Sequence, residues 1–140
     1  MKKNVFSQLR FRGPHIYIHV PFCRRRCDYC DFFSRIGTSS SVRLNVIRRY
    51  REQLSTLYHD FKRSNRLTSV YVGGGTPSAL DGADWSALLQ LIDELGADEK
   101  TVEINPEDVT SRRLGDLRDV GVNRISIGMQ TFDDTLLRTI

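Results

Sequence analysis

The 140-residue sequence lacks the features that mark secreted and membrane-spanning proteins. It has only three cysteines, an odd number, and all three lie in one short stretch with no partner elsewhere, which argues against a secreted disulfide framework. No apolar run approaches the length of a membrane span, and Met1 is not followed by the apolar run that a secretory signal needs. We therefore expect a soluble globular domain in the cytoplasm.

Negative charge is the scarcer sign, with 17 Asp and Glu against 21 Lys and Arg and a net charge of +4. The arginines are concentrated around residues 10–12, 24–26, 43–51 and 62–66. No strand of the RNA-binding type is present, and scattered charge of this kind is typical of a solvated surface, so we do not expect nucleic acid as a partner. The arginines at 24–26 lie between the first two cysteines and would favour an acidic partner or an anionic ligand.

The three cysteines belong to residues 17–33, which read Y-I-H-V-P-F-C-R-R-R-C-D-Y-C-D-F-F. Cys23, Cys27 and Cys30 have the spacing C-x3-C-x2-C and come directly after a short apolar run with strand character. Closing so short a loop costs little entropy, and iron–sulfur clusters are held by thiolates at this kind of spacing. Three ligands for a four-iron cluster would leave one iron open to a small molecule.

Two other interpretations of the cysteines remain open on their spacing alone. A structural zinc site takes four protein ligands, so it would have to recruit His15 or His19. The cysteines could also be buried core residues, although the arginines at 24–26 and Asp28 are unusual in a core segment. The triplet by itself does not separate these possibilities from an iron–sulfur cluster.

Hydrophobic periodicity predicts strands that alternate with helices. The strands are expected at residues 16–20, 69–73, 101–105 and 123–129. The first helix is expected around the apolar positions from Ile47 to Phe61. The second is expected over 85–95, with Asp84 as N-cap and Gly96 as stop. The third is expected over 114–120 with Gly121 as stop, and a fourth begins at about residue 133. No hairpin signal separates the strands, which predicts a parallel sheet covered on both faces.

The two sides of each predicted strand differ in polarity. Valine and isoleucine occupy one side, whereas the other side carries Tyr71, Gly73, Glu103, Asn105, Ser126, Gly128 and Gln130. In a β/α barrel the polar set would face inward, and the reactive positions lie at the C-terminal ends of the strands. The cysteines, the glycine run, Glu103 and Gln130 all lie at such ends. The sequence therefore predicts an α/β fold, a partial (β/α) TIM-like barrel of about four units.

A glycine run and two polar side chains are further candidates for ligand binding. Residues 73–77 read G-G-G-T-P, and glycine lets a backbone approach a ligand closely, although such runs more often only make turns. Glu103 would be costly to bury without a partner, and its structural alternative is an ion pair with Arg124. The structural alternative for Gln130 is a solvated polar group at the rim of the barrel.

Together these motifs make residues 17 to about 132 similar to the radical S-adenosylmethionine (SAM) superfamily. Within it, the likeness is to the oxygen-independent coproporphyrinogen III oxidases and the related HemW-type heme chaperones, through Y-I-H-V-P-F-C, D-Y-C-D-F-F, G-G-G-T-P-S and S-I-G-M-Q-T-F. The resemblance implies a 4Fe-4S cluster on the three cysteines, with SAM bound to the fourth iron. It also implies SAM contacts from Tyr17, Tyr29, Gly74, Gly75, Thr76, Glu103 and Gln130. Taken alone, the two tyrosines would be better explained by packing.

The family's chemistry is one-electron reduction of SAM to methionine and a 5'-deoxyadenosyl radical, with a donor such as flavodoxin or ferredoxin. The oxidase branch carries a further cysteine where this chain has Asp31, so the resemblance favours the chaperone branch, with heme or porphyrin as ligand. An oxidase and an inactive fragment are the alternatives. We expect residues 15–140 to form the N-terminal part of a radical SAM core, and residues 1–14 to be an N-terminal extension.

Overall fold

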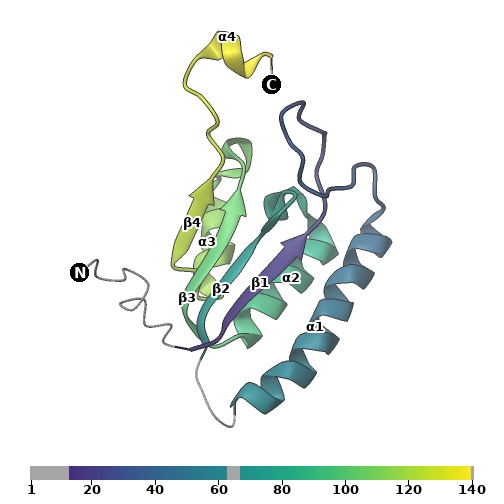
Figure 1. Cartoon of the computed structure of the whole chain (residues 1–140), viewed down its shortest axis with the longest axis vertical. Helices are drawn as coiled ribbons and strands as arrows, with labels where there is room; N and C mark the ends of the chain where they lie inside the picture. Colours follow the sequence, from purple (N-terminus) through teal and green to yellow (C-terminus); the bar gives the residue numbers. More distant parts are fainter. Residues whose placement is uncertain (1–12, 63–66, 140) are drawn as a thin grey trace, which may run out of the picture.

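The structure is a computed structural model that describes the backbone of residues 13–62 and 67–139 and the side chains of residues 13–57 and 67–139. Four parallel strands form one sheet in the order β1 (His15–Val20), β2 (Leu67–Gly74), β3 (Ala97–Ile104) and β4 (Arg124–Ile127). The helices are α1 (Ser40–Lys62), α2 (Gly82–Glu94), α3 (Ser111–Asp119) and α4 (Asp134–Leu137), with two 3-10 turns, η2 (Pro77–Ala79) and η3 (Pro106–Asp108). The predicted alternation of strands and helices is confirmed (Figure 1). Most of the predicted extension, residues 1–14, lies outside the described residues.

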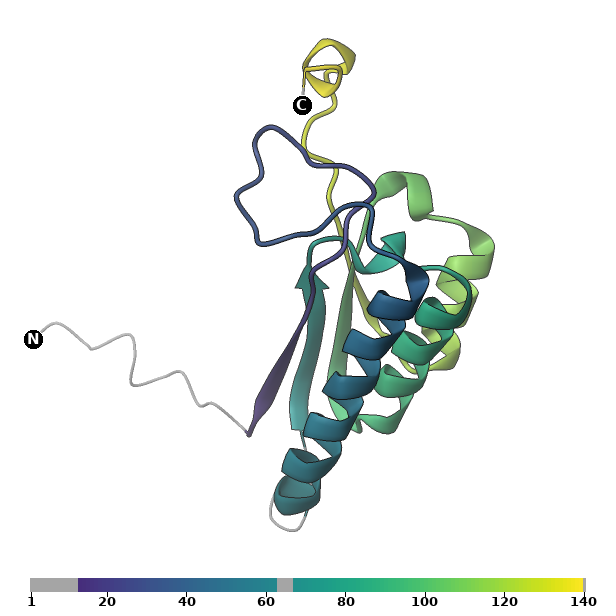
Figure 2. The same cartoon turned by 90° about the vertical axis from the view of Figure 1, so that its right-hand side faces the viewer.

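Helices α1, α2 and α3 all cover the same face of the sheet (Figure 2). In the part of the chain that the structure describes, no helix covers the other face, so the prediction that both faces are covered is wrong there. The reason is the strand order, because each strand pairs with the next one along the chain. Crossovers between parallel strands are right-handed, so a sheet that grows in one direction places every crossover helix on the same side. The uncovered face corresponds to the inner face of a β/α barrel, of which this sheet is an open part.

The hydrophobic core lies between the sheet and the three crossover helices. It is made by the buried side chains Ile18, Val20, Ile47, Val70, Val72, Leu88, Leu91, Ile92, Val102 and Leu117, among others. The predicted apolar side of the strands is therefore confirmed for β1, β2 and β3. On β4, Ile127 remains 44% exposed, because α4 does not pack on that strand but lies beyond the strand ends (Figures 1 and 2).

Helix α1 shows the predicted apolar stripe as far as Leu54. Ile47 is buried, and Tyr50 and Leu54 pack against the core. The next predicted position, Leu57, is exposed, and the side chain of Phe61 lies outside the described residues. None of the helices in the described ranges is long and apolar enough to cross a bilayer.

Helix α2 has Asp81 as its N-cap residue, so the prediction of Asp84 as N-cap is wrong. Asp84 lies in the first turn of the helix and is fully buried. Its carboxylate accepts a hydrogen bond from Ser40 Oγ (2.6 Å) and a charge-assisted one from Arg43. Both donors belong to the first turn of α1, and a negative charge is favourable near a helix N-terminus. Asp84 therefore joins the beginnings of α1 and α2.

Strand β3 begins four residues before its predicted start, because the charged residues after Ala97 hid it from the periodicity. Lys100 is buried there and donates to the carbonyl oxygens of Ile92 (2.8 Å) and Val120 (3.0 Å). These carbonyls lie at the C-terminal ends of α2 and α3, where backbone acceptors lack partners within the helix. Gly121 has a φ of 79° directly after the C-cap of α3, as expected for its predicted role as helix stop.

Candidate functional site

The C-terminal ends of the four strands carry the segments that the sequence singled out. The cysteine loop, residues 21–39, joins β1 to α1, and the glycine turn, residues 73–77, joins β2 to η2. Glu103 is near the end of β3, and Gln130 follows β4. The strands are parallel, so these four segments lie at the same end of the sheet (Figure 1). The predicted site therefore has its elements on one edge.

The two ends of the cysteine loop are held together by backbone hydrogen bonds. Arg35 N donates to Pro21 O (2.7 Å), and Cys23 N donates to Arg35 O (3.1 Å). Further out, Cys30 N donates to Cys27 O (3.1 Å) and forms a turn between the second and third cysteines. These hydrogen bonds fix the part of the loop next to the sheet, whereas most residues in the outer part of the loop are exposed.

All three cysteines are free thiols of intermediate burial, so each can supply a thiolate. In the described ranges no three His, Cys, Asp or Glu side chains are already drawn together as a metal site, so the structure shows the donors and their loop but not a closed coordination shell. Thiolates are the ligands that iron–sulfur clusters use. The donor set therefore fits such a cluster.

The histidines needed for a zinc site are engaged elsewhere. His19 Nε2 lies 2.9 Å from the carbonyl oxygen of Phe33, and its Nδ1 lies 3.1 Å from Tyr17 OH. His15 is hydrogen-bonded to Ser69 Oγ (2.8 Å) at the N-terminal end of β1, away from the cysteine loop. Neither histidine is therefore placed to serve as the fourth ligand that a structural zinc site would need.

The glycine turn approaches the base of the cysteine loop too closely for larger residues. A Cβ at Gly75 would lie 2.8 Å from the backbone nitrogen and oxygen of Phe22. Gly74 has a φ of 111°, which L-residues rarely adopt, and a Cβ there would meet the His19 ring. Gly75 N also donates to Val20 O (2.9 Å). Glycine is therefore needed at Gly75 for close backbone packing, and at Gly74 for its φ and for the adjacent His19 ring, whatever else the turn binds.

Glu103 holds the glycine turn from the uncovered face of the sheet. Its carboxylate accepts hydrogen bonds from Tyr71 OH (2.6 Å) and from Gly74 N (3.1 Å). The predicted alternative, an ion pair between Glu103 and Arg124, is not formed, since Arg124 Nη1 instead lies 3.1 Å from Glu99. Glu103 therefore positions the backbone at the end of β2.

Two tyrosines stand beside Glu103 on this face. The hydrogen bond to Glu103 and, to a smaller extent, burial raise the pKa of Tyr71. Burial and, to a smaller extent, the negative charge of Glu103 raise the pKa of Tyr17. Both phenols are therefore protonated donors at neutral pH. Tyr17 is 57% exposed, which does not fit the alternative of core packing, and its ring lies 6.0 Å from that of Tyr71.

Tyr29 and Gln130 are not joined to this group by hydrogen bonds among the described residues. Tyr29 is exposed in the outer part of the cysteine loop, and burial followed by the nearby Cys27 raises its pKa. Gln130 is exposed and has a φ of 56°. A non-glycine residue in this left-handed region is held there by its surroundings, and such positions concentrate at functional sites.

Residues 17–140 match the family described as the radical SAM superfamily. The chain belongs to this superfamily. It is 35% identical over 129 residues to heme chaperone HemW of Bacillus subtilis (strain 168), and 39% identical over 128 residues to heme chaperone HemW of Lactococcus lactis subsp. lactis (strain IL1403). Each alignment covers 89% of this chain but only 34% and 32% of the relatives. The chain therefore spans about a third of the length of these proteins.

A solved structure supports the same assignment for this radical SAM chain. Coproporphyrinogen III oxidase (HemN) from Escherichia coli, described as a radical SAM enzyme, matches with a TM-score of 0.71 and 27% identity. The match covers 91% of this chain and 30% of the oxidase. The predicted α/β fold of the radical SAM type is thereby confirmed.

Sequence reasoning missed one polar network among the loops at this end of the sheet. Arg24 donates from Nη1 (2.9 Å) and Nη2 (2.7 Å) to the two carboxylate oxygens of Asp108. Ser78 Oγ donates to the same carboxylate (2.6 Å) and accepts from Asn105 N (3.1 Å). The only sequence signal was position, since Ser78 and Asp108 follow the ends of β2 and β3 just as the cysteines follow β1. The network joins the three loops.

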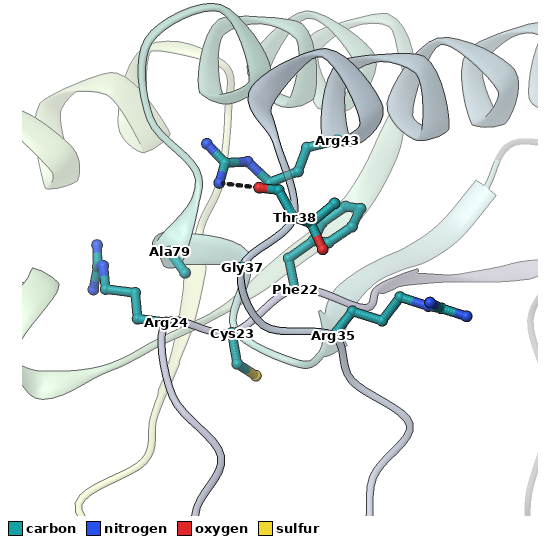
Figure 3. Close-up of a pocket in the computed structure, with 8 residues that line it drawn as sticks. All are labelled: Phe22, Cys23, Arg24, Arg35, Gly37, Thr38, Arg43 and Ala79. Carbon is teal, nitrogen blue, oxygen red and sulfur yellow. Dashed lines mark hydrogen bonds between the residues drawn. The ribbon is translucent and has the colours of Figure 1, made fainter.

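Asp108 and Ser78 are buried, which makes this network more than a surface contact. Burial alone acts to raise the pKa of Asp108, but the hydrogen bonds from Arg24 and Ser78 hold it below its usual value. Behind the loop, a pocket of about 100 Å³ is lined by residues that include Cys23, Arg24 and Arg43 (Figure 3). There Arg43 donates to Thr38 O (3.1 Å), which ties the end of the cysteine loop to α1. The pocket is far too small for a ligand of SAM's size.

Proposed function

We propose that this chain binds a 4Fe-4S cluster through Cys23, Cys27 and Cys30 and binds SAM beside it, in the service of heme or porphyrin metabolism. The observation that carries the proposal is the three free thiols in one loop, at the same end of the sheet as a glycine turn held by Glu103. When bound, such a cluster supplies an electron for the reduction of SAM.

The chain's own residues would bind and orient the cofactor. The three cysteines would hold iron, and the exposed Tyr17 and Tyr29 would offer aromatic surface. Gly74, Gly75, Thr76, Glu103 and Gln130 are the proposed SAM contacts. Glu103 has a defined task in this arrangement, because its hydrogen bond to Gly74 N sets the shape of the turn that the ligand would meet.

The electron donor is proposed to be an acidic protein such as a flavodoxin or ferredoxin. Arg25 and Arg26 are exposed in the cysteine loop next to Cys27. Arg24 is already paired with Asp108, so the positive charge offered to a partner would come from the other two arginines. Opposite charge on the two surfaces would speed their encounter, and salt would weaken it.

A heme-chaperone role is favoured over coproporphyrinogen oxidation by the HemW relatives and by Asp31, which stands directly after Cys30. The oxidase remains the second candidate because the matching solved structure is an oxidase. The two roles can be distinguished with a chimeric protein, in which this chain replaces the matching third of a HemW relative. Heme binding without coproporphyrinogen turnover fits the first role, and clear turnover would restore the second.

Anaerobic reconstitution with iron and sulfide tests the core of the proposal. We expect about one four-iron cluster per chain, a brown protein, and a change in the EPR spectrum of the reduced cluster when SAM is added. A colourless protein without bound iron would instead support the alternative of an inactive fragment. If the cluster forms but its EPR spectrum does not change when SAM is added, the proposal of cluster binding stands and the proposal of SAM binding is contradicted.

Glu103→Ala is expected to weaken SAM binding while leaving iron and sulfide content unchanged. Losing a polar contact, or the turn geometry that it maintains, costs about 1 kcal/mol or more, which is a factor of about five in affinity. The measurement is SAM titration followed by EPR. Glu99→Ala is the matched control, because Glu99 lies on the same strand and pairs with Arg124 near its other end. Equal SAM affinity in the parent and Glu103→Ala would give Glu103 a structural role only.

A further inference from the structure

Thr76 places its hydroxyl on the first cysteine. Thr76 Oγ1 lies 3.5 Å from Cys23 Sγ, within hydrogen-bonding range for sulfur. Thr76 is the N-cap residue of η2, a position where a threonine hydroxyl commonly accepts a hydrogen bond from a backbone N–H. Here it makes no such cap. The hydroxyl is directed at the sulfur instead.

Three constraints hold that hydroxyl in place. Thr76 N donates to Phe22 O (2.7 Å), only one residue before Cys23. Pro77 follows, and a residue before proline is confined to extended backbone, as the φ of −141° and ψ of 95° of Thr76 show. The side chain is also buried. The threonine and the cysteine therefore belong to one rigid contact between the glycine turn and the cysteine loop.

We propose that Thr76 tunes the reduction potential of a cluster held by Cys23, by donating a hydrogen bond to that sulfur. This inference rests on the proposed cluster binding. A ligating cysteine is a thiolate and has no proton to give, so the hydroxyl must be the donor. A donor to a ligand sulfur offsets negative charge, and the reduced cluster carries one more negative charge than the oxidised one. Thr76 would therefore stabilise the reduced form and raise the potential.

The test is a dithionite titration of the reconstituted cluster without SAM, in which the reductant supplies one electron and no covalent bond changes. We expect Thr76→Val, which keeps the shape but lacks the hydroxyl, to have a more negative midpoint potential than the parent. Thr76→Ser keeps the hydroxyl and is expected to recover most of the difference. Thr68→Val makes the same substitution at the opposite end of β2 and should leave the potential unchanged.

Iron and sulfide content, measured on the same samples, separates the possible failures. Full cluster content with identical potentials in the parent, Thr76→Val and Thr76→Ser would overturn the tuning role while leaving cluster binding intact. A parent protein that holds no cluster would instead overturn the proposed function itself. Loss of the cluster in Thr76→Val but not in Thr76→Ser would also contradict tuning, and would make the hydroxyl a requirement for assembly.

Discussion

Single replacement of Cys23, Cys27 or Cys30 with alanine is expected to reduce the iron and sulfide of the reconstituted protein to background. The chain has no other cysteine, so a lost thiolate cannot be replaced by a neighbouring one. His19, the histidine nearest to the cysteines in the sequence, is held by Tyr17 and by the carbonyl of Phe33. Because one iron is already proposed to lack a protein ligand, losing a further ligand should leave too few to retain a cluster.

Asp28→Ala is the matched control for these cysteine variants. Asp28 lies in the same loop between Cys27 and Cys30 and is exposed, but its carboxylate is a hard oxygen ligand that suits other metals. We expect its cluster content to equal that of the parent, measured by absorbance and by iron and sulfide analysis. A variant in which all three cysteines are replaced with alanine should hold no cluster, and cluster retention in it would contradict the proposed function.

Asp84→Ala should lower the free energy of unfolding by about 2–3 kcal/mol, because it removes a buried charge and leaves Ser40 Oγ and Arg43 Nε without their acceptor. Asp84 is fully buried between α1 and α2, where it accepts from Ser40 and Arg43. The expected loss of stability is small for the disruption of a buried ion pair, because Arg43 keeps Thr38 O and Asp81 as hydrogen-bond partners. Denaturant unfolding measures it.

The control is an aspartate whose ion pair is open to water. Asp119 pairs with Arg118 at 3.1 Å, with side chains that are 69% and 80% exposed. Pairs of this kind contribute about 0–1 kcal/mol, so Asp119→Ala should be nearly silent. Equal destabilisation by the two alanine variants would show that the Asp84 contacts do not stabilise the fold.

The pH dependence of the Asp84 effect follows from its pKa. Burial acts to raise that pKa, but the hydrogen bonds from Ser40 and Arg43 lower it below its ordinary 3.8. A carboxyl with a depressed folded pKa stabilises the protein above its unfolded pKa, and this contribution is lost as the pH falls through the folded value. The advantage of the parent over Asp84→Asn should therefore be full at pH 7 and shrink below about pH 4.

Much of this molecule could be predicted from residue patterns because its strands obey them. The alternation of Val70 and Val72 with Tyr71 reflects one buried and one open side of β2, and the structure has the same division. Periodicity did not reveal the start of β3, since Asp98 and Glu99 remove the apolar signal there. The coverage of only one sheet face could not be read from any single strand either, because it depends on the order in which the strands pair.

The candidate site shows the same limit. The cysteines, the glycine run, Glu103 and Gln130 were placed at strand ends by the sequence pattern, whereas the side chains that contact them were not predicted. Nothing in the spacing of Arg24 and Asp108, which lie 84 residues apart, indicates that they meet. Thr76 was expected to contact SAM, and the structure brings its hydroxyl to Cys23. Contacts between loops depend on side-chain reach in three dimensions, which sequence periodicity does not encode.

The order of the strands has a consequence for how this chain can be assembled during translation. Each strand pairs with the one made just before it, so the sheet can extend in step with synthesis and needs no later segment to be inserted between earlier ones. The pairing of β1 with β2 is complete in register once Gly74 has been made. Those two strands carry both the cysteine loop and the glycine turn. The backbone contacts between the cysteine loop and the glycine turn therefore lie within the first two strands, whereas the hydrogen bond from Gly74 N to Glu103 can form only when β3 has joined the sheet.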